Sequence, residues 1–217
     1  KPYTLSIDIS LTVQGILKTG RNSWKKYGMQ PGDVLLMSRP LGAGIFFAAQ
    51  MRNLQVFESY ESVFNKLISS QQFLIDQINS LQDMVGEKIV HAATDITGYG
   101  FLGHLKEMID ASNSKRIKNN FSKIKVLLDL PSFKAYPGVF DLIRKGIRSS
   151  LFLENKKIFD QVFSQKYGEE TIIFSKKKYS FDNEFFEKVE LLIDPQTCGP
   201  LLISCESKYY EYLNSNW

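Results

Sequence analysis

Short apolar runs of strand length alternate along this chain with longer stretches whose apolar residues recur at helical spacing. Strands are predicted where apolar and polar residues alternate or where a short apolar run is nearly continuous: 3–13, 34–38, 89–93, 124–128, 189–193 and 201–205. Helices are predicted where the spacing is helical: 44–52, 58–84, the segment after Gly100, a short piece at 139–143, and 151–163. This order favours an α/β fold (α+β layered), with a mixed sheet flanked by helices.

Size, charge and cysteine content exclude several classes of protein. The 217 residues are enough to bury one core, and the formal net charge is only +4. The one short basic run, residues 176–178, is typical of a solvated loop and not of a nucleic-acid surface. No apolar stretch approaches the ~20 residues that cross a bilayer. Two cysteines suit neither a disulfide scaffold nor a zinc site, so we expect a cytoplasmic protein with reduced thiols and no nucleic-acid or membrane partner.

The first junction that could carry chemistry covers residues 94–100. A predicted strand ends on Asp95, and Gly98 and Gly100 allow a sharp turn into the next helix. The start of that helix presents free N–H groups to an anion, and a carboxylate beside an anion is what a magnesium–phosphate site requires. The alternative is that Asp95 only caps a turn and the glycines only allow the helix to begin.

The second junction covers residues 194–200, between two predicted strands. It begins Asp194-Pro195, which by composition is an ordinary hairpin turn. Cys198 lies within it, but no histidine or other base is near it in sequence, so a nucleophilic role is disfavoured. Taken alone, this segment is better interpreted as a structural turn.

Three blocks of the sequence together resemble selenophosphate synthetases (selenide, water dikinases). Residues 93–105 resemble the family's TD(I/V)TGFGLLGHL signature, residues 194–202 its DPQTSGGLL, and residues 32–44 its GDxLxLTKPLGxG. The blocks occur in the family's order and span most of the chain. The resemblance implies the C-terminal domain of the aminoimidazole-ribonucleotide synthetase-like fold.

The family makes selenophosphate, AMP and phosphate from selenide, ATP and water, and it requires Mg²⁺. By resemblance, Asp95 is the one metal ligand in this chain, whereas the nucleophile and the other ligands belong to an N-terminal half. We therefore interpret residues 1–15 as a residual strand of that N-terminal ATP-binding domain and residues 16–217 as the C-terminal domain. The full-length parent is expected to be an enzyme and a homodimer, and the fragment alone to be inactive.

The sequence departs from the family pattern at several positions. Arg39 replaces a lysine, Tyr99 a phenylalanine, Cys198 a serine, and Pro200 a glycine, and residues 146–155 stand where many members have a glycine-rich stretch. Pro200 has no N–H to offer an anion. Residues 46–52 are closer to a subgroup fused behind a flavoprotein oxidoreductase domain. These differences leave two alternatives: a non-catalytic assembly or regulatory module in a fusion protein, or a sister ATP-dependent synthetase or kinase.

Overall fold

The centre of the fold is a three-stranded antiparallel sheet. The structure is a computed structural model that describes residues 10–54, 60–164, 170–175 and 183–215. The sheet has the order β1 (Asp33–Met37), β5 (Leu201–Glu206), β2 (Val90–Asp95). Both outer strands are antiparallel to β5, so Met37 and Asp95 lie at the same end of the sheet, where β5 begins.

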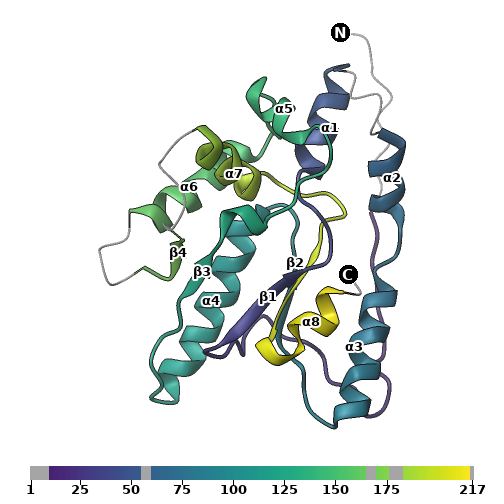
Figure 1. Ribbon diagram of the computed structural model, residues 1–217, viewed down its shortest axis with the longest axis vertical. Helices are drawn as coiled ribbons and strands as arrows, with labels where there is room; N and C mark the ends of the chain where they lie inside the picture. Colours follow the sequence, from purple (N-terminus) through teal and green to yellow (C-terminus); the bar gives the residue numbers. More distant parts are fainter. Residues whose placement is uncertain (1–9, 55–59, 165–169, 176–182, 216–217) are drawn as a thin grey trace.

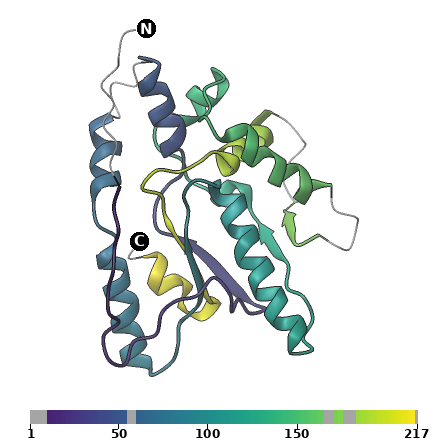
Figure 2. The ribbon, with the colours of Figure 1, turned by 180° about the vertical axis from the view of Figure 1, so that it is seen from behind.

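Alternating side chains of this sheet face two different helical layers. Leu36, Ile203 and Cys205 pack with the helices α3 (Gln72–Val85) and α8 (Tyr210–Asn214). Leu35 and Leu202 on the other face belong to a larger core that includes the long helix α4 (Gly100–Lys118). Because successive side chains of a strand point to opposite faces, the nearly continuous apolar runs of β1 and β5 serve both cores. Figures 1 and 2 show the sheet between α3 and α4.

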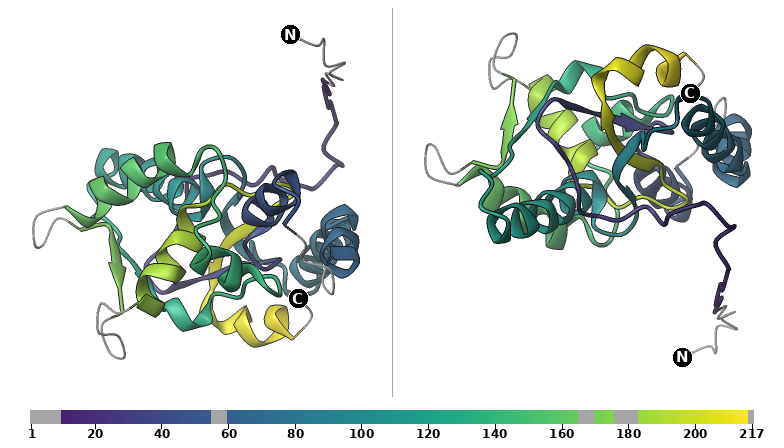
Figure 3. Two further views of the ribbon diagram at one scale, coloured as in Figure 1. Left: turned by 90° about the horizontal axis from the view of Figure 1, so that it is seen from above. Right: turned by 90° about the horizontal axis from the view of Figure 1, so that it is seen from below.

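A second, parallel pair of strands lies beyond the free edge of β1. It consists of β3 (Val126–Leu128) and β4 (Ile172–Phe174). A parallel bridge between Leu41 and Ala135 links the segment after β1 to the segment that follows β3. Figure 3 shows this pair on the side of the molecule away from α2 and α3. The described strands therefore do not form the single mixed sheet that was expected. They form one antiparallel and one parallel sheet, which are separate between β1 and β3.

The remaining elements complete the outer layers. They are α1 (Ala43–Met51), α2 (Tyr60–Ile68), the 3₁₀ turn η1 (Leu130–Ser132), α5 (Val139–Arg144), α6 (Phe152–Phe163), α7 (Asn183–Ile193) and the 3₁₀ turn η2 (Ser207–Tyr209). Helices α6 and α7 pack on α4, and α5 packs on α1 and α7. No helix in the described part of the chain is long and apolar enough to span a membrane.

The predicted strands at 34–38, 89–93, 124–128 and 201–205 are confirmed within two residues, as are the helices at 44–52, 139–143 and 151–163. The predicted strand 3–13 lies mostly outside the described residues. Its described part, 10–13, is not a strand, and Leu11 and Val13 are more than four-fifths exposed. The basic run 176–178 also lies outside the described residues.

The predicted strand at 189–193 is wrong, because this run is the end of helix α7. A short apolar run fits a buried strand or a buried helix equally well, and the helical spacing of Phe185, Val189 and Leu192 was the overlooked signal. All three are buried.

The single helix predicted over 58–84 is two helices, α2 and α3. They are separated at Ser69 and Ser70, whose hydroxyls bond the Lys66 carbonyl and the Gln72 N–H. Such local bonds compete with a continuous helix. The helix predicted after Gly100 is α4, which continues to Lys118, where basic side chains suit the negative end of the helix dipole.

Candidate functional site

The two junctions identified in the sequence lie against each other. The Ile96 N–H donates to the Pro200 carbonyl (2.9 Å), and the Gln196 N–H donates to the Thr97 carbonyl (3.0 Å). These two bonds continue the pairing of β2 with β5 past Asp95. Residues more than ninety positions apart in sequence therefore form one site.

Glycines allow the two segments to approach this closely. Gly100 has φ +66°, and a Cβ there would overlap the Ile193 carbonyl and lie 3.0 Å from the Asp194 oxygen. A Cβ on Gly199 would overlap the Ile96 carbonyl. Both Gly98 and Gly100 were candidates for a positive φ in this turn. Gly100 has a positive φ and Gly98 does not, so the turn into α4 is made at Gly100.

The third sequence block, residues 32–44, meets the same junction through Gln196. The buried Gln196 Oε1 accepts hydrogen bonds from the N–H groups of Gly42 (2.9 Å) and Ala43 (3.1 Å), at the start of α1. Its Nε2 donates to the Asp194 carbonyl (2.9 Å). The side chain thus satisfies N–H groups that the first turn of a helix leaves without partners. This role of Gln196 was not predicted from the sequence, because its target lies 153 residues away.

Asp194 is a fully buried carboxylate in the same junction. It accepts hydrogen bonds from the Ser149 N–H (2.9 Å) and from the Ser149 hydroxyl. Burial raises the pKa of Asp194 from 3.8 to about 6, although Ser149 and the nearby Arg148 act in the opposite direction. Residues 194–200 are not the predicted hairpin turn, because they join helix α7 to strand β5. The Asp194 side chain nevertheless has a structural role, since it holds the loop after α5.

We expect Asp194→Asn to remove a pH-dependent contribution to stability. Because the folded-state pKa is raised, this contribution is fully present below about pH 4 and is lost as the pH rises through 6. At 1.36 kcal/mol per pKa unit, the loss is about 2–3 kcal/mol. Urea unfolding of the wild type and the variant at several pH values between about 4 and 7 measures it. The variant should gain stability relative to the wild type as the pH rises, whereas a constant difference would contradict the prediction.

Asp95, the predicted metal ligand, lies at the end of β2, where the three blocks converge. Its side chain is exposed, and no hydrogen bond or ion pair to its carboxylate occurs among the described residues. The Thr94 hydroxyl contacts only the Asp95 backbone oxygen (3.2 Å). The carboxylate therefore caps no turn, contrary to the structural alternative, and its oxygens are available to a ligand.

Behind Asp95, a buried histidine links the loop to α4. His104 Nε2 lies 3.2 Å from the Thr97 hydroxyl, and His104 Nδ1 lies 3.2 Å from a Glu107 carboxylate oxygen. Burial lowers the pKa of His104 below its ordinary value, against the opposing effects of Glu107 and Asp95. The imidazole is therefore neutral near pH 7. From the sequence alone, His104 had no predicted role beyond membership of the signature.

The residues present fit a magnesium site only in part. Asp95 supplies one hard oxygen of the type that Mg²⁺ prefers. Within the described ranges, no group of three or more His, Cys, Asp or Glu side chains is arranged to hold a metal ion. A site at Asp95 would hence need ligands beyond the His, Cys, Asp and Glu side chains of those ranges, such as phosphate and water oxygens.

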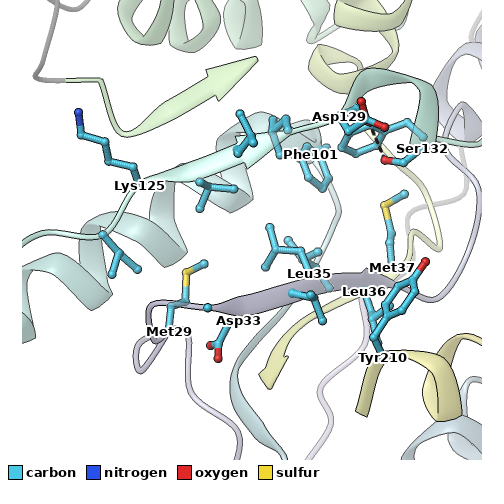
Figure 4. Close-up of a pocket in the computed structure, with 18 of the residues that line it drawn as sticks. Met29, Asp33, Leu35, Leu36, Met37, Phe101, Lys125, Asp129, Ser132 and Tyr210 are labelled. Carbon is cyan, nitrogen blue, oxygen red and sulfur yellow. Dashed lines mark hydrogen bonds between the residues drawn. The ribbon is translucent and has the colours of Figure 1, made fainter. Parts of the chain in front are cut away.

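A cavity in the described part of the chain lies apart from Asp95. It has a volume of about 970 Å³ and opens between β1 and β3, which belong to different sheets. Figure 4 shows Leu35 and Met37 of β1 and Phe101 of α4 pointing into it, with Lys125 and Asp129 on the β3 side. Asp95 does not line this cavity.

Comparison with known proteins gives a consistent result. A family model described as AIR synthase related protein, C-terminal domain, matches residues 30–134. A selenide, water dikinase of Caldanaerobacter subterraneus subsp. tengcongensis is 30% identical over 206 residues, which cover 94% of this chain and 49% of the relative. One of Pelobacter propionicus is 29% identical over 210 residues, with the same coverage. The resemblance to selenophosphate synthetases is confirmed. The chain spans about half the length of these relatives.

Solved structures agree on the fold. A hydrogenase maturation protein HypE has a TM-score of 0.52 at 13% identity, over 92% of this chain and 43% of that chain. The thiamine-monophosphate kinase of Stenotrophomonas maltophilia K279a has a TM-score of 0.50 at 14% identity, over 89% and 45%. The predicted fold class, an α/β domain of the aminoimidazole-ribonucleotide synthetase-like type, is confirmed. The division at residue 15 stays a prediction.

Arg39, which replaces the lysine of the selenophosphate synthetase pattern, binds backbone carbonyls in this chain. Its guanidinium donates to the carbonyls of Leu67 (3.1 Å), Cys198 (3.1 Å) and Ser69. The arginine thereby ties the end of α2 to the 194–200 turn. A lysine ammonium has no planar fork with which to make these bonds in the same way.

Cys198 and Pro200 occupy the turn at the other departures from that pattern. Cys198 is exposed with φ +49°, and its backbone carbonyl, not its thiol, is the group that binds Arg39. Pro200 is buried, and its carbonyl accepts from Ile96. Both cysteines are free, and burial raises the pKa of Cys205 to about 12, so that this thiol is inert.

Cys198→Ser is expected to be close to neutral. Serine is the residue of the selenophosphate synthetase pattern, and the thiol is exposed and takes part in none of the bonds described above. The change in unfolding free energy should stay within about 0.5 kcal/mol, as for ordinary surface substitutions. Urea unfolding and an ATP turnover assay on the full-length protein measure the two effects. A large loss of turnover would mean that the thiol has a chemical role.

Proposed function

We propose that this chain is the C-terminal domain of an ATP-dependent selenophosphate synthetase, which converts selenide, ATP and water to selenophosphate, AMP and phosphate. The observation that carries the proposal is the position of the Asp95 carboxylate. It is exposed, it has no hydrogen bond or ion pair among the described residues, and it lies where the three signature blocks contact one another. The similarity to selenide, water dikinases over 94% of the chain supports it.

In this proposal Asp95 helps to hold Mg²⁺ on the ATP phosphates. The cation, when bound, offsets the charge that develops on the phosphoryl group during transfer. The chain contributes a carboxylate on a rigid strand end, whose position is set by the Ile96–Pro200 and Gln196–Thr97 bonds. A fixed ligand position matters because phosphoryl transfer depends on alignment and electrostatic stabilisation.

The isolated chain should be inactive. One carboxylate cannot bind a triphosphate and its cations, and the family's nucleophile and other metal ligands are expected in the N-terminal half, which also supplies the main homodimer surface. ATP and Mg²⁺ therefore bind only when both halves are present.

Assay of the full-length protein with selenide, ATP and Mg²⁺ tests the proposal. AMP is followed by chromatography and selenophosphate by phosphorus NMR, and both products should appear together. ATP cleavage without selenophosphate would indicate a sister enzyme on the same fold. No turnover by the full-length protein would overturn the enzymatic proposal in favour of a non-catalytic module, such as one fused to a flavoprotein oxidoreductase domain.

A further inference from the structure

Four polar side chains form a continuous chain of contacts that ends at Thr97. Lys26 Nζ lies 2.7 Å from Glu107 Oε2, the same oxygen lies 3.2 Å from His104 Nδ1, and His104 Nε2 lies 3.2 Å from Thr97 Oγ1. Lys26 comes from the segment before β1, in which the Lys25 carbonyl accepts from the Ala93 N–H of β2 (2.8 Å). The contacts thus connect three separate elements to the loop beyond Asp95.

The chemistry of these groups fixes the direction of each hydrogen bond. A carboxylate can only accept, so His104 Nδ1–H donates to Glu107, and Nε2 of the neutral ring accepts from the Thr97 hydroxyl. Lys26 also donates to Glu107, so the Glu107 carboxylate is the acceptor in both of its contacts. The single hydroxyl proton of Thr97 is thereby committed to His104, and its oxygen is left to the other side as an acceptor or ligand.

The backbone of Thr97 is held as firmly as its side chain. Its carbonyl accepts from the Gln196 N–H (3.0 Å) and from the Gly100 N–H (3.0 Å). The residue is partly exposed, whereas His104 is only 5% exposed. Thr97 lies two positions beyond Asp95, whose carboxylate is close enough to influence the imidazole. Ile96, between Asp95 and Thr97, is fully buried, and alternate side chains of an extended segment lie on the same side, so the side chains of Asp95 and Thr97 are on the less buried side.

We propose that Thr97 Oγ1 is a second protein oxygen, beside Asp95, that binds the divalent cation directly or through its water. His104 and Glu107 are positioning residues that hold the Thr97 proton away from the cation. Hydroxyl and carboxylate oxygens suit a hard cation, and hydrogen-bonded partners commonly orient metal ligands in this way. The inference rests on the proposed function and adds a ligand to its site.

Mn²⁺ binding to the full-length protein tests this inference without measuring activity. Electron paramagnetic resonance of free Mn²⁺, in the presence of a non-hydrolysable ATP analogue, gives the affinity of each variant. We expect Thr97→Val to weaken Mn²⁺ binding by ~10-fold and Thr97→Ser to restore it. His104→Gln should weaken binding in the wild type but not in a Thr97→Val background, because its effect acts through Thr97. Thr19→Val, which removes an exposed hydroxyl remote from the site, is the matched control.

The outcomes separate this inference from the proposed function. If Asp95→Asn abolishes Mn²⁺ binding but Thr97→Val and His104→Gln leave it unchanged, the role of Thr97 is wrong and the metal site stands. If Asp95→Asn also leaves binding unchanged, the metal site of the proposed function is itself wrong. If Thr97→Val does not fold, the Mn²⁺ affinity of the His104→Gln variant is the test. An affinity equal to that of the wild type would overturn the positioning role of His104.

Discussion

Replacing Asp95 by Asn in the full-length protein should reduce ATP turnover by at least ~100-fold and leave the fold intact, because loss of an outer partner of a metal site already costs ~10–100-fold. The amide keeps the shape of the side chain but removes the charge that attracts a hard cation. The fold should not change, since the carboxylate is exposed and takes part in no hydrogen bond or ion pair within the described residues.

A matched control is Asp110→Asn, which removes an exposed carboxylate of α4 whose ion-pair partner among the described residues is Lys106 on the same helix. Such a surface ion pair contributes little, so this variant should keep its turnover. Turnover is followed as AMP release, and circular dichroism checks the fold. Wild-type turnover in Asp95→Asn would remove the central support for the proposed function.

Gly100→Ala is expected to destabilise the folded domain strongly, with a loss of ~2–5 kcal/mol in the free energy of unfolding. A positive φ costs an alanine ~1–2 kcal/mol, and forcing extra atoms into a packed region adds ~1–3 kcal/mol. The added Cβ would overlap the backbone at Ile193, which is held in place by the junction and cannot rotate away as a side chain could.

Gly86→Ala provides the control for the backbone contribution. Gly86 follows α3 with φ +69°, almost the same as Gly100, but no heavy atom lies within 4 Å of the Cβ position. It should lose only ~1–2 kcal/mol. Urea unfolding of both variants gives the difference. Equal losses in the two would show that the junction around Gly100 is loosely packed.

Much of the fold follows from local patterns in the sequence. Strand β5 and helix α1 were predictable, because a short apolar run bounded by turn residues and a run after Gly42 with helical spacing each favour one structure. Helix α7 was not predictable in the same way. Four of its last five residues are apolar, which fits a buried strand as well as a buried helix. The helical spacing from Phe185 onward, or the tertiary packing, is needed to identify the helix.

Of the candidate site, the position of Asp95 could be predicted from the sequence, whereas the roles of the other residues could not. The carboxylate is local, since a strand end, a glycine-rich turn and a helix start are adjacent in the sequence. The roles of Gln196, Asp194 and His104 depend on partners brought close by the fold: the start of α1, Ser149, and Glu107 with Thr97. A single sequence carries no signal for such pairs.

The interlocking of the three signature blocks has a consequence for how this sequence family is recognised. Gly199 and Gly100 are required by close backbone contacts, and Gln196 and Asp194 bond to α1 and to Ser149, all independently of any reaction. A descendant that had lost its catalytic half would still need these residues in order to fold. The presence of the blocks in a sequence therefore indicates that the domain has this fold, and does not by itself indicate activity. Asp95 is different, because the fold does not need it, and a pseudoenzyme could have another residue at this position.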